Sequence, residues 1–249
     1  MAGEAERLAE WLSAAKNAVA FTGAGISTES GIPDFRSPGG VWSKYRTVDY
    51  SEFLASAPAR DEYWRQKAEA HGDLAAARPN RGHDVLAAWE RRRLLRGVIT
   101  QNIDGLHQQA GSRAVLELHG TARDGSCLDC GWRAAIEPFL EEFGRTGRAP
   151  ACPRCGGRFK HATVSFGQAL PTEAFAEAMR WAVEAPLMLA IGSSLVVTPA
   201  ADLPRLVVQR GGRLAILNRD PTPLDSLASL VIRAPIGATL AMVAETCRG

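Results

Sequence analysis

Short apolar runs alternate with amphipathic patterns along most of the chain. Helical spacing of apolar residues over residues 4–16 is followed at once by a continuous apolar run over residues 18–22. Further apolar runs lie at 97–100, 114–118, 186–191, 213–217 and 230–233, and helical patterns at 62–70, 83–93, 172–184, 238–246 and, more weakly, 204–209. Strands that alternate with helices predict a doubly wound parallel sheet covered on both faces, the Rossmann-like α/β class.

Two segments interrupt this pattern. Residues 31–51 are polar, aromatic and rich in proline and glycine, with no sustained periodicity, so we expect a functional loop that acts as a lid. From about residue 121 to 161 the composition shifts to cysteine, glycine and arginine. We therefore predict a Rossmann-like domain of residues 1–120 and 162–249, a small inserted module at 121–161, and the segment 31–80 packed beside that module.

The inserted module contains two cysteine pairs. Cys127 and Cys130 form one Cys-x-x-Cys-Gly knuckle, and Cys152 and Cys155 form a second. The glycine after each pair permits the tight turn that directs both thiolates at one ion, which predicts a structural, tetrahedral Zn²⁺ site of the ribbon type. A redox-active dithiol pair is the alternative interpretation, and Cys247 is left over as an ordinary thiol.

Composition and charge exclude several protein classes. Of the 249 residues, 46% are hydrophobic and 22% charged, which argues against disordered, collagen-like and coiled-coil proteins. The formal net charge of +2 gives no support to nucleic acid as the principal partner. No apolar run reaches the length of about 18 residues that spans a membrane, and the first residues are rich in glutamate, so we expect a cytoplasmic protein without a membrane partner.

Polar loops follow several predicted strands. Gly23-Ala24-Gly25 follows the first strand, Gly192-Ser193-Ser194 follows the run at 186–191, and Asn218-Arg219-Asp220 follows the run at 213–217. Because ligands of open α/β sheets bind at the carboxyl ends of strands, these loops indicate a dinucleotide site. Thr28 stands where a dehydrogenase fingerprint places its third glycine, which disfavours hydride transfer. Taken singly, each loop could be a tight turn or a helix cap.

Three further side chains could carry chemistry. Asn102 and Asp104 follow the strand at 97–100, and a carboxylate there would attract the cationic ring of an oxidised nicotinamide. His119 follows the strand at 114–118 and has the pKa range of a general base. The alternatives are a helix cap at Asp104, a surface histidine at position 107 and a structural role for His119.

These motifs, taken together, closely resemble the sirtuin family. The resemblance covers nearly the whole chain in the family's order. It comprises residues 23–27, 30–36, 100–107 and 117–120, the two cysteine knuckles, Phe166-Gly167, residues 192–195 and Asn218.

Sirtuins are NAD-dependent protein-lysine deacylases with a Rossmann-like domain and a small zinc domain. The resemblance implies that the acyl oxygen of a modified lysine attacks the nicotinamide ribose, that nicotinamide leaves, and that His119 then activates a ribose hydroxyl. The products would be lysine, nicotinamide and O-acyl-ADP-ribose. The implied catalytic residues are His119, Asn102 and Asp104. The implied NAD-binding residues are Gly23, Ala24, Gly25, Thr28, Asp34, Phe35, Arg36, Gln101, Asn102, Ile103, Asp104, Gly192, Ser193, Ser194, Asn218 and Arg219.

The resemblance also places the substrate at residues 160–168. Val164, Phe166 and Gly167 would contact the acylated lysine of a protein substrate. Ser165 and Gln168 depart from the family's common aromatic and glutamate residues, so the acyl preference does not follow from the resemblance. Members that remove acidic acyl groups carry Tyr-x-x-Arg. Here Gln66 stands three residues after Tyr63, and Arg65 is about 100° from the required helix face, so desuccinylation is not expected as the main activity.

Deacetylation is the leading prediction, and two alternatives remain open. The first is mono-ADP-ribosyl transfer, in which a protein side chain accepts the ribosyl group. The second is a non-catalytic module that senses NAD and holds nucleic acid with its zinc ribbon. Acidic residues dilute the basic character of the ribbon, which weakens this second alternative. The oligomeric state does not follow from the sequence.

Overall fold

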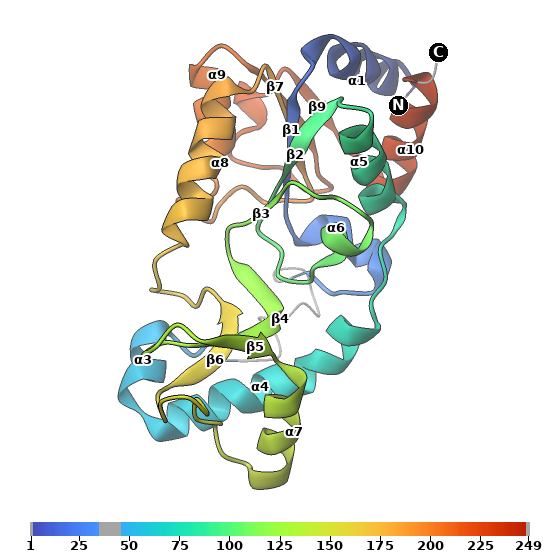
Figure 1. Ribbon diagram of the computed structural model, residues 1–249. Helices are drawn as coiled ribbons and strands as arrows, with labels where there is room; N and C mark the ends of the chain where they lie inside the picture. Colours follow the sequence, from blue (N-terminus) through green and yellow to red (C-terminus); the bar gives the residue numbers. More distant parts are fainter. Residues whose placement is uncertain (1, 35–45, 248–249) are drawn as a thin grey trace.

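The computed structural model describes residues 2–34 and 46–247. Its main sheet has six strands in the order β3-β2-β1-β7-β8-β9, and all its pairings are parallel (Figure 1). The strands are β1 (Ala18–Thr22), β2 (Leu95–Thr100), β3 (Val115–Glu117), β7 (Leu187–Ile191), β8 (Arg213–Leu217) and β9 (Leu230–Ile232). The order reverses between β1 and β7, which creates the crevice where Rossmann-type sheets bind ligands.

Helices cover both faces of this sheet, as the apolar strands require. One face packs against α1 (Ala2–Ala15), α5 (Arg81–Arg91) and α10 (Ile236–Thr246), and the other against α8 (Thr172–Glu184) and α9 (Asp202–Gln209) (Figure 1). Alternate residues of β1 enter the two cores: Ala18 and Ala20 face the first, and Val19 and Phe21 the second. All five residues of β1 are buried, so the strand sits at the centre of the molecule.

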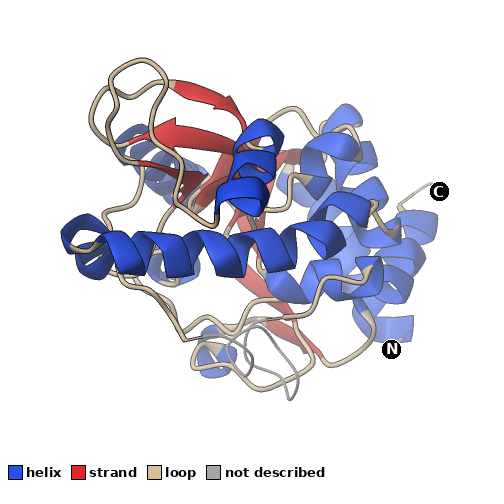
Figure 2. Ribbon diagram, turned by 90° about the horizontal axis from the view of Figure 1, so that it is seen from below, coloured by secondary structure: helices blue, strands red, loops and turns tan. Residues whose placement is uncertain are grey.

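A second, antiparallel sheet of order β5-β4-β6 lies beyond the carboxyl edge of the first. Its elements are β4 (Gly120–Cys127), β5 (Arg133–Ala135), β6 (Phe159–Thr163), α3 (Tyr50–Ala55), α4 (Ala57–Ala76) and α7 (Glu137–Thr146). They share a small core that includes Trp64, Ile136 and Phe159. Seen from below in Figure 2, the long helix α4 crosses the molecule in front of the strands. We call this unit, residues 46–76 and 120–163, the small module.

The predicted fold class is confirmed, and several local predictions are corrected. The loop that follows the first strand continues as a 3₁₀ segment at Ala24–Ser30, which the sequence did not predict, followed by a left-handed Gly31. Helix α3 begins inside the segment expected to be irregular, and α7 lies in the cysteine-rich segment, where no helix was expected. The remaining short elements are α6 (Leu106–Gln109) and a 3₁₀ turn at Asp225–Leu227. The domain boundaries at residues 120 and 162 stay a prediction. Within the described residues, no helix is both long and apolar enough to cross a bilayer.

Candidate functional site

A large cavity of about 1280 Å³ lies between the carboxyl edge of the main sheet and the small module. Residues directly after β1, β2, β7 and β8 line one side of it, and residues of α4 and the segment after β6 line another. The cavity therefore occupies the crevice at the β1/β7 switch of the strand order, where parallel sheets present backbone N–H groups and short polar loops to ligands.

Two loops meet at the cavity floor in direct backbone contact. The Gly25 amide donates to the Gly192 carbonyl oxygen at 2.8 Å, and the Gly23 amide donates to Ile191 at 3.0 Å. A Cβ atom on Gly25 would lie 2.7 Å from the Gly192 Cα atom, closer than any real side chain approaches backbone. Glycine is thus required here because two backbones touch, and the contact holds the loops after β1 and β7 in fixed positions.

A hydrogen-bond network joins the loop after β2 to its neighbours. The Gln101 amide donates to Ser193 Oγ at 2.8 Å, and Asn102 Nδ2 donates to Ser27 Oγ at 3.1 Å. Ser27 in turn donates to the Asp104 carboxylate at 2.7 Å, which also caps the Leu106 amide at 2.9 Å. Asp104 is 4% exposed and does not line the cavity. The structure therefore places it behind Asn102. The other described residues that were predicted to bind NAD or substrate all line the cavity.

His119 lies at the junction of the two sheets, directly before β4, and lines the cavity. Its Nδ1 atom is 3.0 Å from the carbonyl oxygen of Gln101. Because a carbonyl oxygen can only accept, Nδ1 carries the proton of the neutral ring and Nε2 keeps a free lone pair. Burial lowers the pKa of His119, and the Gln101 bond partly opposes this effect. The ring is therefore neutral near pH 7 and can accept a proton at Nε2.

The imidazole of His107 is buried behind this edge, which excludes the surface position considered for it. Its Nε2 atom lies 2.9 Å from Thr22 Oγ1, and Thr22 donates to Thr100 Oγ1 at 2.8 Å. Its ring packs beside that of His83, with the centroids 4.9 Å apart. Burial lowers the pKa of His107 to about 3, so this ring stays neutral and links the ends of β1 and β2.

The segment after β6 brings the small module to His119. The Val164 amide donates to the His119 carbonyl oxygen at 2.8 Å, and Gly120 pairs with Thr163 in the β4–β6 ladder. Val164, Phe166 and Gly167 all line the cavity, and Phe166 is 48% exposed. This extended segment and an exposed aromatic ring form an open side of the cavity next to the imidazole.

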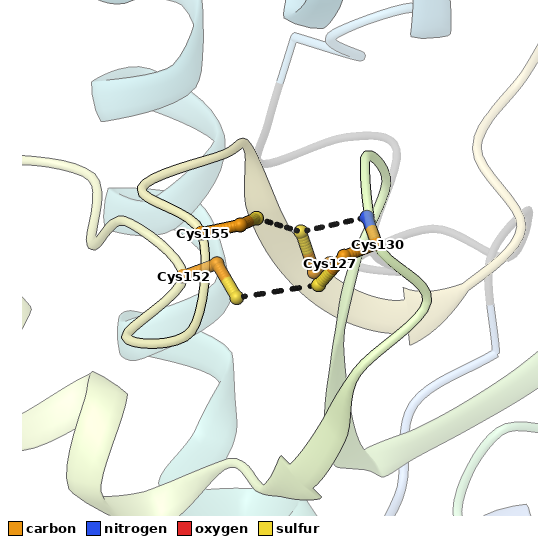
Figure 3. A group of neighbouring side chains, drawn as sticks. All are labelled: Cys127, Cys130, Cys152 and Cys155. Atoms are coloured by element: carbon orange, nitrogen blue, oxygen red, sulfur yellow. Dashed lines mark hydrogen bonds between the residues drawn. The ribbon is translucent and has the colours of Figure 1, made fainter.

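The four paired cysteines converge on one point of the small module. Figure 3 shows their side chains turned toward one another from two loops, and the sulfur atoms all lie within 4.8 Å of each other. The Cys127 and Cys155 sulfurs are 3.6 Å apart, and those of Cys130 and Cys152 are 3.8 Å apart. Four sulfurs at about 2.3 Å from a tetrahedral zinc ion would lie about 3.8 Å apart, so the cluster fits zinc with no open position for substrate.

Most of the predicted site residues meet at the cavity. Those that line it are Gly23, Ala24, Gly25, Thr28, Asp34, Gln101, Asn102, Ile103, His119, Val164, Phe166, Gly167, Gly192, Ser193, Ser194, Asn218 and Arg219. Phe35 and Arg36 lie outside the described residues. Tyr63, which the sequence comparison named only as part of an acyl-group motif, also lines the cavity, as do Lys67 and Met179, which were not predicted from the sequence. The spacing of Tyr63 and Lys67, four residues apart on one helix, is a signal that could have indicated a shared face.

Comparison with known proteins connects this architecture to one family. A protein of Rhodopseudomonas palustris named NAD-dependent protein deacetylase is 48% identical over 237 residues, which cover 94% of this chain and 94% of that protein. A solved structure that concerns the mechanism and regulation of Sir2 enzymes has a TM-score of 0.89 and is 40% identical in sequence. The match covers 100% of this chain and 99% of that chain. A structure of Sir2 with a p53 peptide and NAD⁺ has a TM-score of 0.88 and 37% identity, covering 96% of both chains. The Sir2 family model matches residues 23–199. The chain belongs to the Sir2 family.

Proposed function

We propose that this chain is an NAD-dependent protein-lysine deacylase that removes acetyl groups as its main activity. The observation that carries the proposal is the position of His119, a neutral imidazole held by the Gln101 carbonyl between the strand-end loops and the segment after β6. A relative 48% identical to this chain bears the name of that activity, and a Sir2 structure 37% identical contains NAD⁺ and a peptide.

NAD would bind along the carboxyl edge of the main sheet. The loops at Gly23–Gly25 and Gly192–Ser194 offer backbone N–H groups and hydroxyls to the pyrophosphate, and their glycines allow close backbone approach. Asn218 and Arg219 follow β8 and would contact the adenosine half. Gln101, Asn102 and Ile103 would surround the nicotinamide and its ribose, with Asp104 supporting Asn102 through Ser27.

The acylated peptide would lie beside the extended segment Val164–Gly167, on the side where Phe166 is exposed. NAD supplies a ribose carbon that the acyl oxygen attacks when nicotinamide departs. His119 would accept a proton at Nε2 from a ribose hydroxyl, because its Nδ1 proton is already held by Gln101. Water completes the reaction, which yields lysine, nicotinamide and O-acyl-ADP-ribose.

Zinc would stabilise the small module and take no part in the chemistry. The four sulfurs leave no open coordination position, and the module supplies both the strand β6 that leads into Val164 and the face of α4 that lines the cavity. A cytoplasmic location, which the sequence led us to expect, is part of this proposal.

Mass spectrometry of an acetylated lysine peptide incubated with protein and NAD tests the proposal. We expect free lysine peptide, nicotinamide and O-acetyl-ADP-ribose in equal amounts. A protein that gains ADP-ribose, with the peptide left acetylated, would instead support mono-ADP-ribosyl transfer. Absence of any turnover, together with nucleic-acid binding that weakens steeply with salt, would support the non-catalytic alternative.

A further inference from the structure

The segment that follows β6 folds into a tight turn. The Gln168 amide donates to the Ser165 carbonyl oxygen at 3.0 Å, and the Gln168 side chain accepts from the Ser165 amide at 3.1 Å. Gly167, the third residue of this turn, has a φ of 79°, the left-handed conformation that favours glycine. We call residues 163–168 the 163–168 turn, and the segment that we propose to contact the acylated lysine lies within it.

Lys160 lies on β6, three residues before this turn, and its side chain is buried. The residue is only 1% exposed. Its ammonium donates to the carbonyl oxygen of Thr163, to that of His161 at 3.2 Å, and to Gln168 Oε1 at 3.4 Å. Thr163 and Gln168 are the first and last residues of the 163–168 turn, so Lys160 links its two ends.

The three oxygens match the hydrogen-bonding capacity of an ammonium group. A lysine ammonium has three N–H donors and no acceptor, and carbonyl and amide oxygens only accept. Among the residues that the structure describes, Lys160 has no carboxylate partner, and the centre of the Tyr63 ring lies 5.6 Å from its ammonium.

This buried charge is costly to the fold. Burial and the charge of Lys67 lower the pKa of Lys160 to about 7. An apolar side chain of similar volume, such as methionine, would occupy the same space without that cost. Stability alone therefore does not account for an ammonium at this position, whereas three directed bonds to one turn do.

The 163–168 turn connects the small module to the rest of the site. The Val164 amide donates to the His119 carbonyl oxygen at 2.8 Å, and the Tyr50 amide donates to the Phe166 carbonyl oxygen at 2.9 Å. A change in the shape of the turn would move the proposed peptide-binding surface relative to His119. The strand-end loops of the main sheet, which are held by their own backbone contacts, would keep their positions.

We propose that Lys160 is a positioning residue for the acylated peptide: by bonding to both ends of the 163–168 turn, it holds the turn in the shape that presents Val164 to the substrate beside His119. The inference rests on the proposed deacylase function and names a residue that maintains its peptide-binding surface. Lys160 does not line the cavity, so it acts through the turn and not by contact with the peptide or NAD.

Steady-state kinetics with an acetylated peptide and NAD test this role, at about pH 6, where the Lys160 ammonium is protonated. K160M should raise KM for the peptide about 10-fold, because the unlinked turn no longer presents the peptide in line. Both kcat at saturating peptide and the affinity for NAD should stay within about twofold of wild type, as loss of substrate binding alone predicts. K160R, which keeps a charged donor, should restore most of the wild-type KM.

R133M is the matched control, because Arg133 is a cation of the same three-stranded sheet whose ion pair, with Asp124, is exposed. It should leave the KM values for peptide and NAD unchanged. Zinc-containing K160M protein with the wild-type peptide KM would overturn the inference. Equal losses of kcat and NAD affinity in K160M would also overturn it, since Lys160 would then be a structural residue of the module.

Two variants at Gln168 test the other end of the link and apply even where K160M protein does not fold. Q168L removes the acceptor and should raise the peptide KM by about threefold or more, whereas Q168E keeps an acceptor oxygen and should retain the wild-type value. Folded Q168L with an unchanged peptide KM would overturn the inference alone. Failure of the wild-type protein on every acylated peptide would overturn the proposed function and this inference with it.

Discussion

The two sides of the cavity are built in different ways. The edge of the main sheet is fixed by backbone contacts, since Gly25 touches Gly192 and side-chain bonds tie Gln101 to Ser193. The small module has three strands, two of them of only three and five residues, and its core is partly made of cysteine ligands. One wall is held by close backbone packing, and the other contains four cysteines placed to bind one metal ion.

Because the two walls are built differently, substitutions in them should have different consequences: one wall should affect NAD binding and chemistry, and the other the folding of the small module. Changes at the sheet edge should act on nucleotide binding and chemistry through single atoms, because a large hydrophobic core keeps that edge in place. Changes at the cysteine cluster should act on the module as a whole. The two walls meet at His119, whose carbonyl oxygen and ring nitrogen each bind one of them.

The largest effect is expected from loss of the metal. C130S should abolish zinc binding and unfold the small module, because structural zinc contributes about 10–16 kcal/mol in small zinc-dependent folds. We expect insoluble or inactive protein, measured by zinc content, solubility and deacylation. C247S is the matched control, since that thiol lies outside the cluster and should leave all three readings unchanged. Soluble, zinc-free and active C130S protein would contradict the expectation that the small module needs zinc to fold.

The second prediction concerns the residue where the walls meet. H119A should lower kcat/KM for deacetylation by about 10²- to 10⁴-fold, because it removes the proton acceptor. NAD affinity by calorimetry should be retained, since the imidazole is not predicted to contact the pyrophosphate. Loss of NAD binding together with activity would assign His119 to the nucleotide site instead.

A smaller effect is expected at the backbone contact of the sheet edge. G25A places a methyl group 2.7 Å from the Gly192 Cα atom and should reduce the free energy of unfolding by about 1–3 kcal/mol, with weaker NAD binding. G72A is the control: its Cβ meets nothing within 4 Å on helix α4, and it should be stabilising by up to about 1 kcal/mol. Equal behaviour of the two variants in urea unfolding would contradict the close packing of this wall.

The last effect has no consequence near pH 7 and appears only as the pH falls: it comes from the buried imidazole that links β1 and β2. The folded-state pKa of His107 is about 3, below the unfolded value of about 6.5, so the unfolded chain binds more protons between these pH values. Its contribution to stability is therefore present near pH 7 and lost as pH falls, by about 2 kcal/mol between pH 7 and pH 5.

H107Q isolates this contribution, because glutamine can donate to Thr22 but does not titrate. The difference in unfolding free energy between wild type and H107Q should shift by that amount in favour of the variant on going from pH 7 to pH 5. A difference that stays constant with pH would mean that His107 is not held neutral.

Local sequence patterns predicted the elements whose apolar spacing is strong. The helix at Thr172–Glu184 and the strand at Arg213–Leu217 have the predicted bounds. Helix α7 was not predicted, because its segment was interpreted from its cysteine and glycine content, although Phe139 and Phe143 are spaced one turn apart and buried. Propensity carries little information where a metal and neighbouring elements decide the fold.

In the candidate site, too, some residues could be predicted from local sequence and others depend on tertiary packing. Loops that directly follow strands were predicted because chain connectivity alone brings them to one edge. The burial of Asp104 and the approach of Lys67 could not be predicted in this way. Asp104 turns inward because Ser27, which is 77 residues away in sequence, binds its carboxylate. Lys67 reaches the cavity because α4 packs against α7 and the core of the small module to which it belongs.

A crystal structure of the protein with NAD and an acylated lysine peptide tests the central claim most directly. We expect the nicotinamide ribose within hydrogen-bonding reach of His119 Nε2, the pyrophosphate on the loops after β1 and β7, and the acylated lysine beside Val164. A nucleotide bound elsewhere, or a peptide that leaves His119 facing solvent, would contradict the account.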